Sequence, residues 1–593
     1  MSDRVELEDI LDDAARYVRG EMDDDERAFF EELVNRYPHL REDLRLMQLV
    51  HEELQAMGEQ PAVDGGPAPA APAGRKPWVM AVWVLLGIGL IGAIAWWAAF
   101  RQEKGAESAE NPAVQAGRTK PAEEYLQFRQ LGDESPAADL EIGYAVQWTP
   151  EGELAFAGAL ADSAPLPQEH PLSDGLFGAY DCASGKFTLR ETFGGKGQDD
   201  RALGIAVDSR GDLLVCGRIG DQAVIGGRRI RTIGSGDAGR QDFFISKFSP
   251  QGTLQWIRHN GGKREKFKQT GTNQAIAVAA GPGNEVVVAG NYIGSPTVGG
   301  KKLPVGGPNE ELFLAQYTPS GQLRWIATAT CNYMIAPKDV GADAQGNVYL
   351  CGTFGHHNLG GLAVFEQDTL QSFGGKDIFL AKYSPKGKLL WVRQAGSAVS
   401  EKGYDMANHL AIGPDGQVTV TGEFQGEARF GAQTLASRGG MDVFVARYNA
   451  EGDLLWAQQA GGKEGSGPNP EQGYAVALDR RGATYVTGAF AGEAHFGHEV
   501  LRTTGACNFF LAKYAPEGRL EWAISFLPGA DFLRAEGRGI DIHSNGTIAV
   551  TGAFAGSIQI GDTVLQSTGR EDFFLLLFNE NGELLSAKAL KNS

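Results

Sequence analysis

A block of roughly 66 residues recurs along most of the chain. The stretch GGMDVFVARYNAEGDLLWAQQAGG at 439–462 has counterparts at 241–262, 376–396 and 507–526. Two recurring positions define the repeat. One is the first residue of its apolar strand, which recurs at intervals of 64 to 69 residues, and the other is a glycine that closes an upstream strand. Their positions are Asp174, Asp242, Glu311, Asp377, Asp442, Asn508 and Asp572, and Gly158, Gly217, Gly290, Gly352, Gly422, Gly488 and Gly552. Such a period predicts an array of equivalent supersecondary units.

Each copy has the pattern of four strands joined by turns. In one copy the expected strands are 473–479, 483–490, 508–515 and 519–525. The turns place glycine where a hairpin needs a positive φ, which accounts for a chain with 81 glycines in 593 residues. Four antiparallel strands in each of seven units predict an all-β, seven-bladed β-propeller with four-stranded blades over residues 124–593.

The apolar strand of the repeat is apolar on both faces. Val443 and Val445 point one way, whereas Phe444, Ala446 and Tyr448 point the other way. Both faces must be covered, as they are in a blade between two blades. A tryptophan that recurs in five copies is expected to be a structural plug, and these are Trp256, Trp325, Trp391, Trp456 and Trp522. The polar residue that opens each apolar strand is expected to cap a turn.

The repeat supplies one candidate too many for the outer strand. Both EYLQFRQLG at 124–132 and ELLSAKAL at 583–590 have its pattern. Because a closed ring avoids free sheet edges, we expect residues 125–131 to form the outer strand of the last blade. The C-terminal segment would then pack elsewhere or add a fifth strand.

Residues 78–100, WVMAVWVLLGIGLIGAIAWWAAF, contain no charged side chain. At about 1.5 Å per residue this run crosses a hydrocarbon core of about 30 Å, and aromatic residues at its ends suit the interface. The sequence predicts one transmembrane helix from Trp78 to Phe100. The flanking stretches 59–77, rich in proline and alanine, and 101–123, which is polar, are expected to be linkers. Basic residues on both sides leave the orientation open.

Residues 1–58 have the pattern of a small helical domain. Asp23 and Glu26 form a capping box, and apolar residues follow at helical spacing. The segment carries 17 acidic and 7 basic side chains, which is a net charge of −10 out of −20 for the chain. This acidity suits a solvated surface or a face for a basic protein, and it argues against binding to nucleic acid.

The run RYVRGEMDDDERAFFEELVNRYPHLREDLRLM at 16–47 resembles the cytoplasmic N-terminal domain of bacterial membrane-bound anti-sigma factors. These domains open with a similar Y-x-x-G-E-[LM] phrase. The resemblance implies a sigma factor as the partner of residues 1–58, with Tyr17, Glu21 and Phe29 as candidate contacts. Tyr37 and Leu40 stand where many relatives carry zinc-binding cysteines, so the resemblance implies a zinc-free version.

The repeat itself is similar to the bacterial seven-bladed propeller repeat often called the SBBP repeat. It shares the wording A-x-A-x-D-x-x-G-x-x-Y-V-T-G followed by G-x-x-D-x-F-x-A-K-Y-x-x-x-G-x-L-x-W. Members of that family are typically surface or exported proteins. The two resemblances together imply a protein of the cell (inner) membrane, with the N-terminus in the cytoplasm and a periplasmic or extracellular propeller.

A search for chemistry finds no nucleophile elbow, HExxH motif, P-loop or EF-hand loop, so no enzyme, metal or cofactor is expected. The five cysteines lack CxxC spacing and indicate neither a disulfide framework nor a zinc site. Asp541 and His543 are expected to be satisfied strand residues, and the spacing of His356, His357 and His409 does not suggest a metal. The sequence KREKFK at 263–268 is either a solvated loop or a partner patch with Lys263, Arg264 and Lys266 as contacts.

Three functional hypotheses remain. The first is a membrane signalling protein with an anti-sigma-like inner domain and a propeller that binds an external ligand, protein or glycan. The second is a surface scaffold or adhesin with an inert inner domain. The third is an enzyme, because Gly387-Lys388-Leu389-Leu390-Trp391 resembles the G-K-x-x-W phrase of quinoproteins, although only one copy carries it.

Overall fold

The computed structural model describes residues 139–161, 173–182, 184–194, 200–220, 223–230, 242–260, 273–304, 310–399, 403–462, 471–529, 531–567 and 572–590. The expected helical domain 1–58, both linkers, the transmembrane helix Trp78–Phe100 and the basic stretch 263–268 lie outside these ranges. The regular elements inside them are all strands. No helix in the described ranges has the length and apolarity to cross a membrane.

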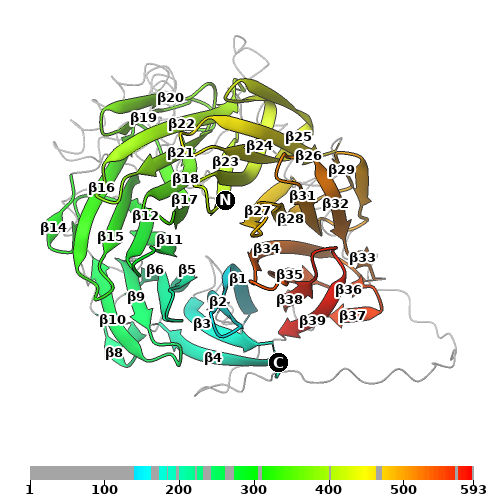
Figure 1. The fold of residues 1–593 in the computed structure, drawn as a ribbon, viewed down its shortest axis with the longest axis horizontal. Coiled ribbons are helices and arrows are strands. Elements are labelled where there is room, and N and C mark those ends of the chain that lie inside the picture. The colour runs from blue at the N-terminus through cyan, green and yellow to red at the C-terminus, as the bar shows by residue number, and fades with distance from the viewer. Residues whose placement is uncertain are drawn as a thin grey trace, which may run out of the picture. The chain divides into compact units, whose positions relative to one another are not determined.

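The described strands form seven antiparallel sets of four, which lie in a ring (Figure 1). Set 1 contains β1 (Asp139–Trp148), β2 (Glu153–Ala161), β3 (Ser173–Asp181) and β4 (Lys186–Phe193), and set 2 contains β5 (Arg201–Val207), β6 (Leu213–Ile219), β9 (Asp242–Phe248) and β10 (Leu254–Asn260). Set 3 contains β11 (Gln274–Ala280), β12 (Val286–Tyr292), β15 (Glu311–Tyr317) and β16 (Leu323–Cys331), and set 4 contains β17 (Ile335–Ala342), β18 (Val348–Phe354), β21 (Asp377–Tyr383) and β22 (Leu389–Ser397). Set 5 contains β23 (Met406–Ile412), β24 (Val418–Phe430), β25 (Gln433–Tyr448) and β26 (Leu454–Gly461). Set 6 contains β27 (Gln472–Leu478), β28 (Thr484–Phe490), β31 (Asn508–Tyr514) and β32 (Leu520–Ser525), and set 7 contains β34 (Arg534–Ile542), β35 (Ile548–Ala555), β38 (Asp572–Phe578) and β39 (Leu584–Leu590).

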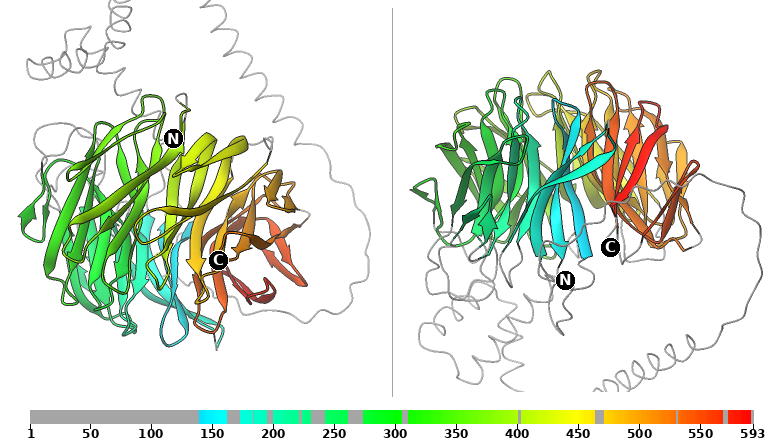
Figure 2. Two further views of the ribbon diagram at one scale, coloured as in Figure 1. Left: turned by 45° about the horizontal axis from the view of Figure 1, so that its top comes forward. Right: turned by 90° about the horizontal axis from the view of Figure 1, so that it is seen from below.

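In each set the chain runs from an innermost strand, through second and third strands, to an outer strand. The four strands expected at 473–525 are confirmed to within one residue as β27, β28, β31 and β32. We call the end of the ring with the tight turns (innermost to second strand, third to outer strand) the turn face. The opposite end, where the other connections lie, is the loop face; the strands run between these two faces (Figure 2).

A short hairpin between the second and third strands is a feature that the sequence analysis missed. These hairpins are β7–β8 (Val224–Ile225, Arg228–Arg229), β13–β14 (Thr297–Val298, Lys301–Lys302), β19–β20 (Leu362–Phe365, Asp368–Gln371), β29–β30 (Glu493–Phe496, Glu499–Arg502) and β36–β37 (Ser557–Ile560, Thr563–Gln566), and in set 5 an extension of β24 and β25. Three of them pair with the outer strand of the preceding set: β19 with β16, β24 with β22 and β29 with β26. The hairpins therefore link neighbouring sets through backbone hydrogen bonds.

Side chains from adjacent sets form the cores between them. On β25, Val443 and Val445 belong to the cluster shared with set 6. Phe444, Ala446 and Tyr448 belong to the cluster shared with set 4. The expected division of this strand between two neighbours is confirmed.

The recurring tryptophan joins each outer strand to the next set. Trp456 is 8% exposed, and its Nε1 donates to the Pro516 carbonyl at 2.9 Å. Its ring lies so close to Gly518 (φ +89°) that a Cβ there would come within 2.6 Å of it. Equivalent bonds reach the turn of the next set from Trp256, Trp325 and Trp391. The structural role expected for these residues is confirmed.

Two of the residues that open third strands cap turns, as expected, whereas Glu311 accepts from Cys331 N at 3.2 Å and Asn508 donates to the Phe526 carbonyl at 3.0 Å. Asp377 Oδ2 accepts from Phe373 N at 2.9 Å, and Asp442 Oδ2 accepts from Arg438 N at 3.2 Å. Cys216 and Cys351 are fully buried in second strands, and all five cysteines are free.

The first and last sets meet and pack together. Phe156 and Leu176 of set 1 share a core with Phe573 and Leu575 of set 7. The place of the outer strand in set 7 is taken by β39, which pairs with β38 from Phe573↔Leu590 to Phe578↔Leu584. The expectation that residues 125–131 fill this place is wrong, because the C-terminal segment supplies the in-register apolar partner; residues 124–132 lie outside the described ranges.

Candidate functional site

Two polar side chains near the centre of the ring satisfy backbone donors of the neighbouring set. The innermost strands have a free edge, whose N–H groups need partners. Asp541 Oδ2 on β34 accepts from Trp148 N on β1 at 2.7 Å. Gln147 Oε1 on β1 accepts from Val207 N on β5 at 2.9 Å. These bonds link sets 7, 1 and 2.

Asp339 and His409 form a second pair of side chains that contact backbone N–H groups of the next set, at sets 4, 5 and 6. Asp339 Oδ2 accepts from Leu410 N at 2.9 Å, and His409 Nδ1 lies 3.4 Å from Val476 N. Asp339 Oδ2 is also 3.5 Å from His409 Nδ1. Burial raises the pKa of Asp339, with the nearby His409 acting in the opposite direction.

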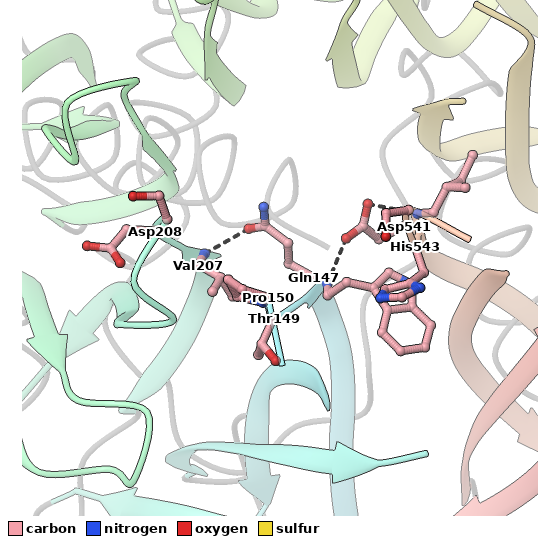
Figure 3. Close-up of a pocket in the computed structure, with 11 residues that line it drawn as sticks. Gln147, Thr149, Pro150, Val207, Asp208, Asp541 and His543 are labelled. Carbon is pink, nitrogen blue, oxygen red and sulfur yellow. Dashed lines mark hydrogen bonds between the residues drawn. The ribbon is translucent and has the colours of Figure 1, made fainter. Parts of the chain in front are cut away.

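The turn-face ends of β34, β1 and β5 line an open pocket of about 400 Å³ (Figure 3). This volume is in the range of small-molecule sites. In Figure 3 the amide nitrogen of Gln147 points toward the open space between Asp208 and Asp541. The lining residues come from three turns and strand ends: Gln147, Trp148, Thr149, Pro150, Val207, Asp208, Ser209, Asp541, Ile542, His543 and Ser544.

The pKa values of the two carboxyl groups of the pocket shift in opposite directions. Burial raises the pKa of Asp541 to about 6, although hydrogen bonds from Trp148 N and Ile542 N act against this rise. Burial acts to raise the pKa of Asp208, but its bond to Lys247 Nζ at 2.6 Å and hydrogen bonds from Arg210 N and Asp212 N together lower that pKa. Asp208 is therefore a fixed anion that is already paired, whereas Asp541 titrates near neutrality.

The remaining polar groups suit the binding of a small polar molecule. The ring of His543 lies 4.8 Å from that of Trp148, measured between centroids. Gln147 has one amide nitrogen to donate, and Ser544 adds a hydroxyl. Among the described residues no group of His, Cys, Asp or Glu has the arrangement of a metal site.

Asp541 and His543 are predicted from the sequence to be satisfied strand residues, and the bond from Trp148 N confirms this for Asp541. Gln147 is not among the predicted site residues. A signal for it is present, because the equivalent position in sets 2 to 6 holds alanine or glycine: Ala206, Ala279, Gly341, Ala411 and Ala477. The Gly387–Trp391 phrase forms a turn and an inter-set tryptophan contact. Tyr17, Glu21, Phe29, Lys263, Arg264 and Lys266 lie outside the described residues.

No family model matches the chain. It is 24% identical over 424 residues to an uncharacterised WD repeat-containing protein of Acanthamoeba polyphaga mimivirus, covering 60% of this chain and 29% of the relative. It is 28% identical over 199 residues to the regulatory protein FlaEY of Caulobacter vibrioides, covering 33% of this chain and 19% of the relative. The match spans less than a third of the length of either relative.

Solved structures with a similar fold were also found. One is a protein of unknown function from Dyadobacter fermentans (TM-score 0.33, 11% identity, covering 66% of this chain and 95% of that one). Another is an α-L-arabinanase from Penicillium chrysogenum (TM-score 0.30, 10% identity, covering 70% and 91%). At these scores the similarities say nothing about activity. The four-stranded sets and the repeat-containing relative make this a β-propeller repeat protein.

Proposed function

We propose that this chain is a single-pass membrane regulatory protein whose β-propeller binds a ligand outside the cytoplasm. In this proposal each of the seven sets is one blade of a closed propeller. Residues 1–58 lie in the cytoplasm and hold a partner there, with a sigma factor as the first candidate. The uncharged run 78–100 joins the two parts. The Caulobacter relative is named as a regulatory protein, which is consistent with such a role.

The observation that carries the binding role is the pocket between sets 7, 1 and 2. Two of its walls come from residues 147–150 and 541–544. The hydrogen bond from Trp148 N to Asp541 joins these walls, although the two residues are 393 positions apart in the sequence. A ligand that contacts both walls stabilises the contact between the two ends of the propeller. Because β1 is the described strand nearest in sequence to the run 78–100, this contact is well placed to couple binding to the membrane segment.

The topology is tested by adding protease to intact spheroplasts. We expect the propeller to be released while residues 1–58 stay protected. Degradation of residues 1–58 with the propeller intact would show the opposite orientation, and protection of both parts would contradict an exported propeller.

The regulatory role is tested by a pull-down with residues 1–58 as bait. Capture of a sigma factor, lost when Phe29 is changed to aspartate, supports signalling. If residues 1–58 capture no sigma factor while the exported propeller still binds cells or glycans, the alternative of an anchored scaffold or adhesin is favoured. We propose no reaction for the propeller.

A further inference from the structure

Each innermost strand carries a β-bulge close to its loop-face end. In all seven sets the register against the second strand shifts at one place. A bulge inserts an unpaired residue and re-aims its side chain. In sets 2 to 7 the inserted residues are Leu203, Ile276, Lys338, Asn408, Tyr474 and Arg538.

These six side chains, which we call the bulge ring, are all partly exposed. Their neighbours on the strand are mostly buried; Ala202, Ala275 and Ala407, for example, are 0% exposed. The innermost strands surround the centre of the ring (Figure 1), and neighbouring sets cover both faces of each strand, so the centre is where we place the exposed surface of the bulge ring. The bulge ring lies about three residues, or roughly 10 Å, along the strands from the pocket at the turn face.

The bulge ring has two chemically different halves. Sets 2 and 3 contribute Leu203 and Ile276, which are apolar. Sets 4 to 7 contribute polar or aromatic side chains, beginning with Lys338, which is next to Ile276 in the order of the sets. A molecule at this end of the ring therefore meets an apolar wall beside a cation.

Most polar groups of the second half are already occupied. Arg538 Nη2 bonds to Glu536 Oε2 at 2.9 Å, and its guanidinium lies 5.9 Å from the ring of Tyr474. Asn408 Nδ2 donates to Glu423 Oε2 at 2.6 Å.

Lys338 differs from these residues. The part of the chain that the structure describes shows no hydrogen bond or ion pair for its ammonium group. It interacts electrostatically with Glu423, but burial raises the pKa of that carboxyl group to about 7, so Glu423 neutralises it only in part near pH 7. A partly exposed cation whose acidic neighbour is only partly charged favours an anionic ligand.

We propose that the loop-face end of the ring binds a small organic carboxylate with a short apolar tail. The carboxylate pairs with Lys338, and the tail packs against Ile276 and Leu203. This site is separate from the turn-face pocket and does not depend on the proposed signalling role.

The test measures binding of butanoate, acetate and butylammonium to the full chain in lipid nanodiscs by saturation-transfer NMR. We expect butanoate to bind more tightly than acetate and butylammonium not to compete. Lys338→Met, which keeps the length of the side chain, should weaken butanoate at least tenfold, whereas Lys338→Arg should retain it. Lys386→Met, in an exposed turn, is the matched control.

Ile276→Ser distinguishes the contribution of the apolar tail from that of the carboxylate. We expect it to weaken the binding of butanoate and to leave the binding of acetate unchanged. Equal butanoate binding by Lys338→Met and the unaltered chain would overturn the proposal. Competition by butylammonium, or no butanoate binding to the unaltered chain, would overturn it as well. Failure of the turn-face pocket to bind any ligand would leave these results unaffected, so the two sites are tested separately.

Discussion

Glu423 on β24 is a carboxyl group that folding removes completely from water. Its close polar partners are amides: Asn408 Nδ2 at 2.6 Å and Gln472 Nε2 at 3.5 Å. Burial raises the pKa of Glu423 to about 7, above the value of about 4.3 expected in an unfolded chain. The folded state therefore holds a proton that the unfolded state releases between these two pH values.

The sign of the pH dependence follows from this difference. The contribution of Glu423 to stability is complete below about pH 4 and is lost as the pH rises through 7, by an amount on the order of 3 kcal/mol. We predict that Glu423→Gln raises the melting temperature at pH 8 but changes it little at pH 5. Exposed Glu427→Gln on the same strand is the control. The same gain at both pH values would show that the charge of Glu423 is not the cause.

Gly422 is one of the recurring glycines that define the repeat. It pairs with Ala407, next to the β-bulge of β23, and we attribute the need for glycine to this bulge. A Cβ at Gly422 would lie 1.9 Å from the carbonyl oxygen of Met406 and 2.9 Å from Phe444. We predict that Gly422→Ala lowers the free energy of unfolding by about 1–3 kcal/mol or more, since this is the usual range for overpacking. Gly440→Ala, where a Cβ meets no atom within 4 Å, should be nearly neutral in denaturant unfolding. If the two changes lowered the free energy of unfolding equally, this explanation of the recurring glycine would be refuted.

At the scale of elements, the tryptophan of the outer strand contributes to the contact between neighbouring sets. Trp456 loses both its ring packing on Gly518 and its bond to the Pro516 carbonyl when it is truncated. We predict that Trp456→Ala lowers the unfolding free energy by about 3–5 kcal/mol. Leu455→Ala, next to it but 48% exposed, should change it by less than about 0.5 kcal/mol. Chemical denaturation of the two variants measures the difference.

Strand positions were predictable because the repeat period, the turn glycines and the apolar runs all agree for these elements. The inter-set hairpins were missed, although their turns repeat in sequence as IGGRRI, VGGKKL, FEQDTL, FGAQTL, FGHEVL and IGDTVL. The repeated glycine there has a φ of 54–56°, and Glu366 replaces it at 49°. With only two to four residues in most hairpin strands, alternation gave no signal. The pocket could not be predicted, because Gln147 and Asp541 meet only through contacts between distant sets.

The whole molecule depends on closure between set 1 and set 7. The cores of other neighbours join segments that are close in sequence, but this one joins the two ends of the repeat array. The outer strand of set 7 was predicted wrongly, since two segments match the outer-strand pattern and only pairing with β38 distinguishes them. Closure also forms the turn-face pocket, so the proposed binding role depends on it.

A disulfide across this junction tests closure most directly. A Cβ at Gly539 on β34 would lie 3.0 Å from Val146 Cγ1 on β1, so a cysteine at each position is within bonding reach once the Thr551 hydroxyl, 2.6 Å from that Cβ, rotates away. We predict that Val146→Cys with Gly539→Cys forms an intramolecular disulfide under mild oxidation, found by peptide mapping of the unreduced monomer. Neither single variant should form it. Free thiols at both positions, or a disulfide found only between two chains, would contradict a ring closed by sets 1 and 7.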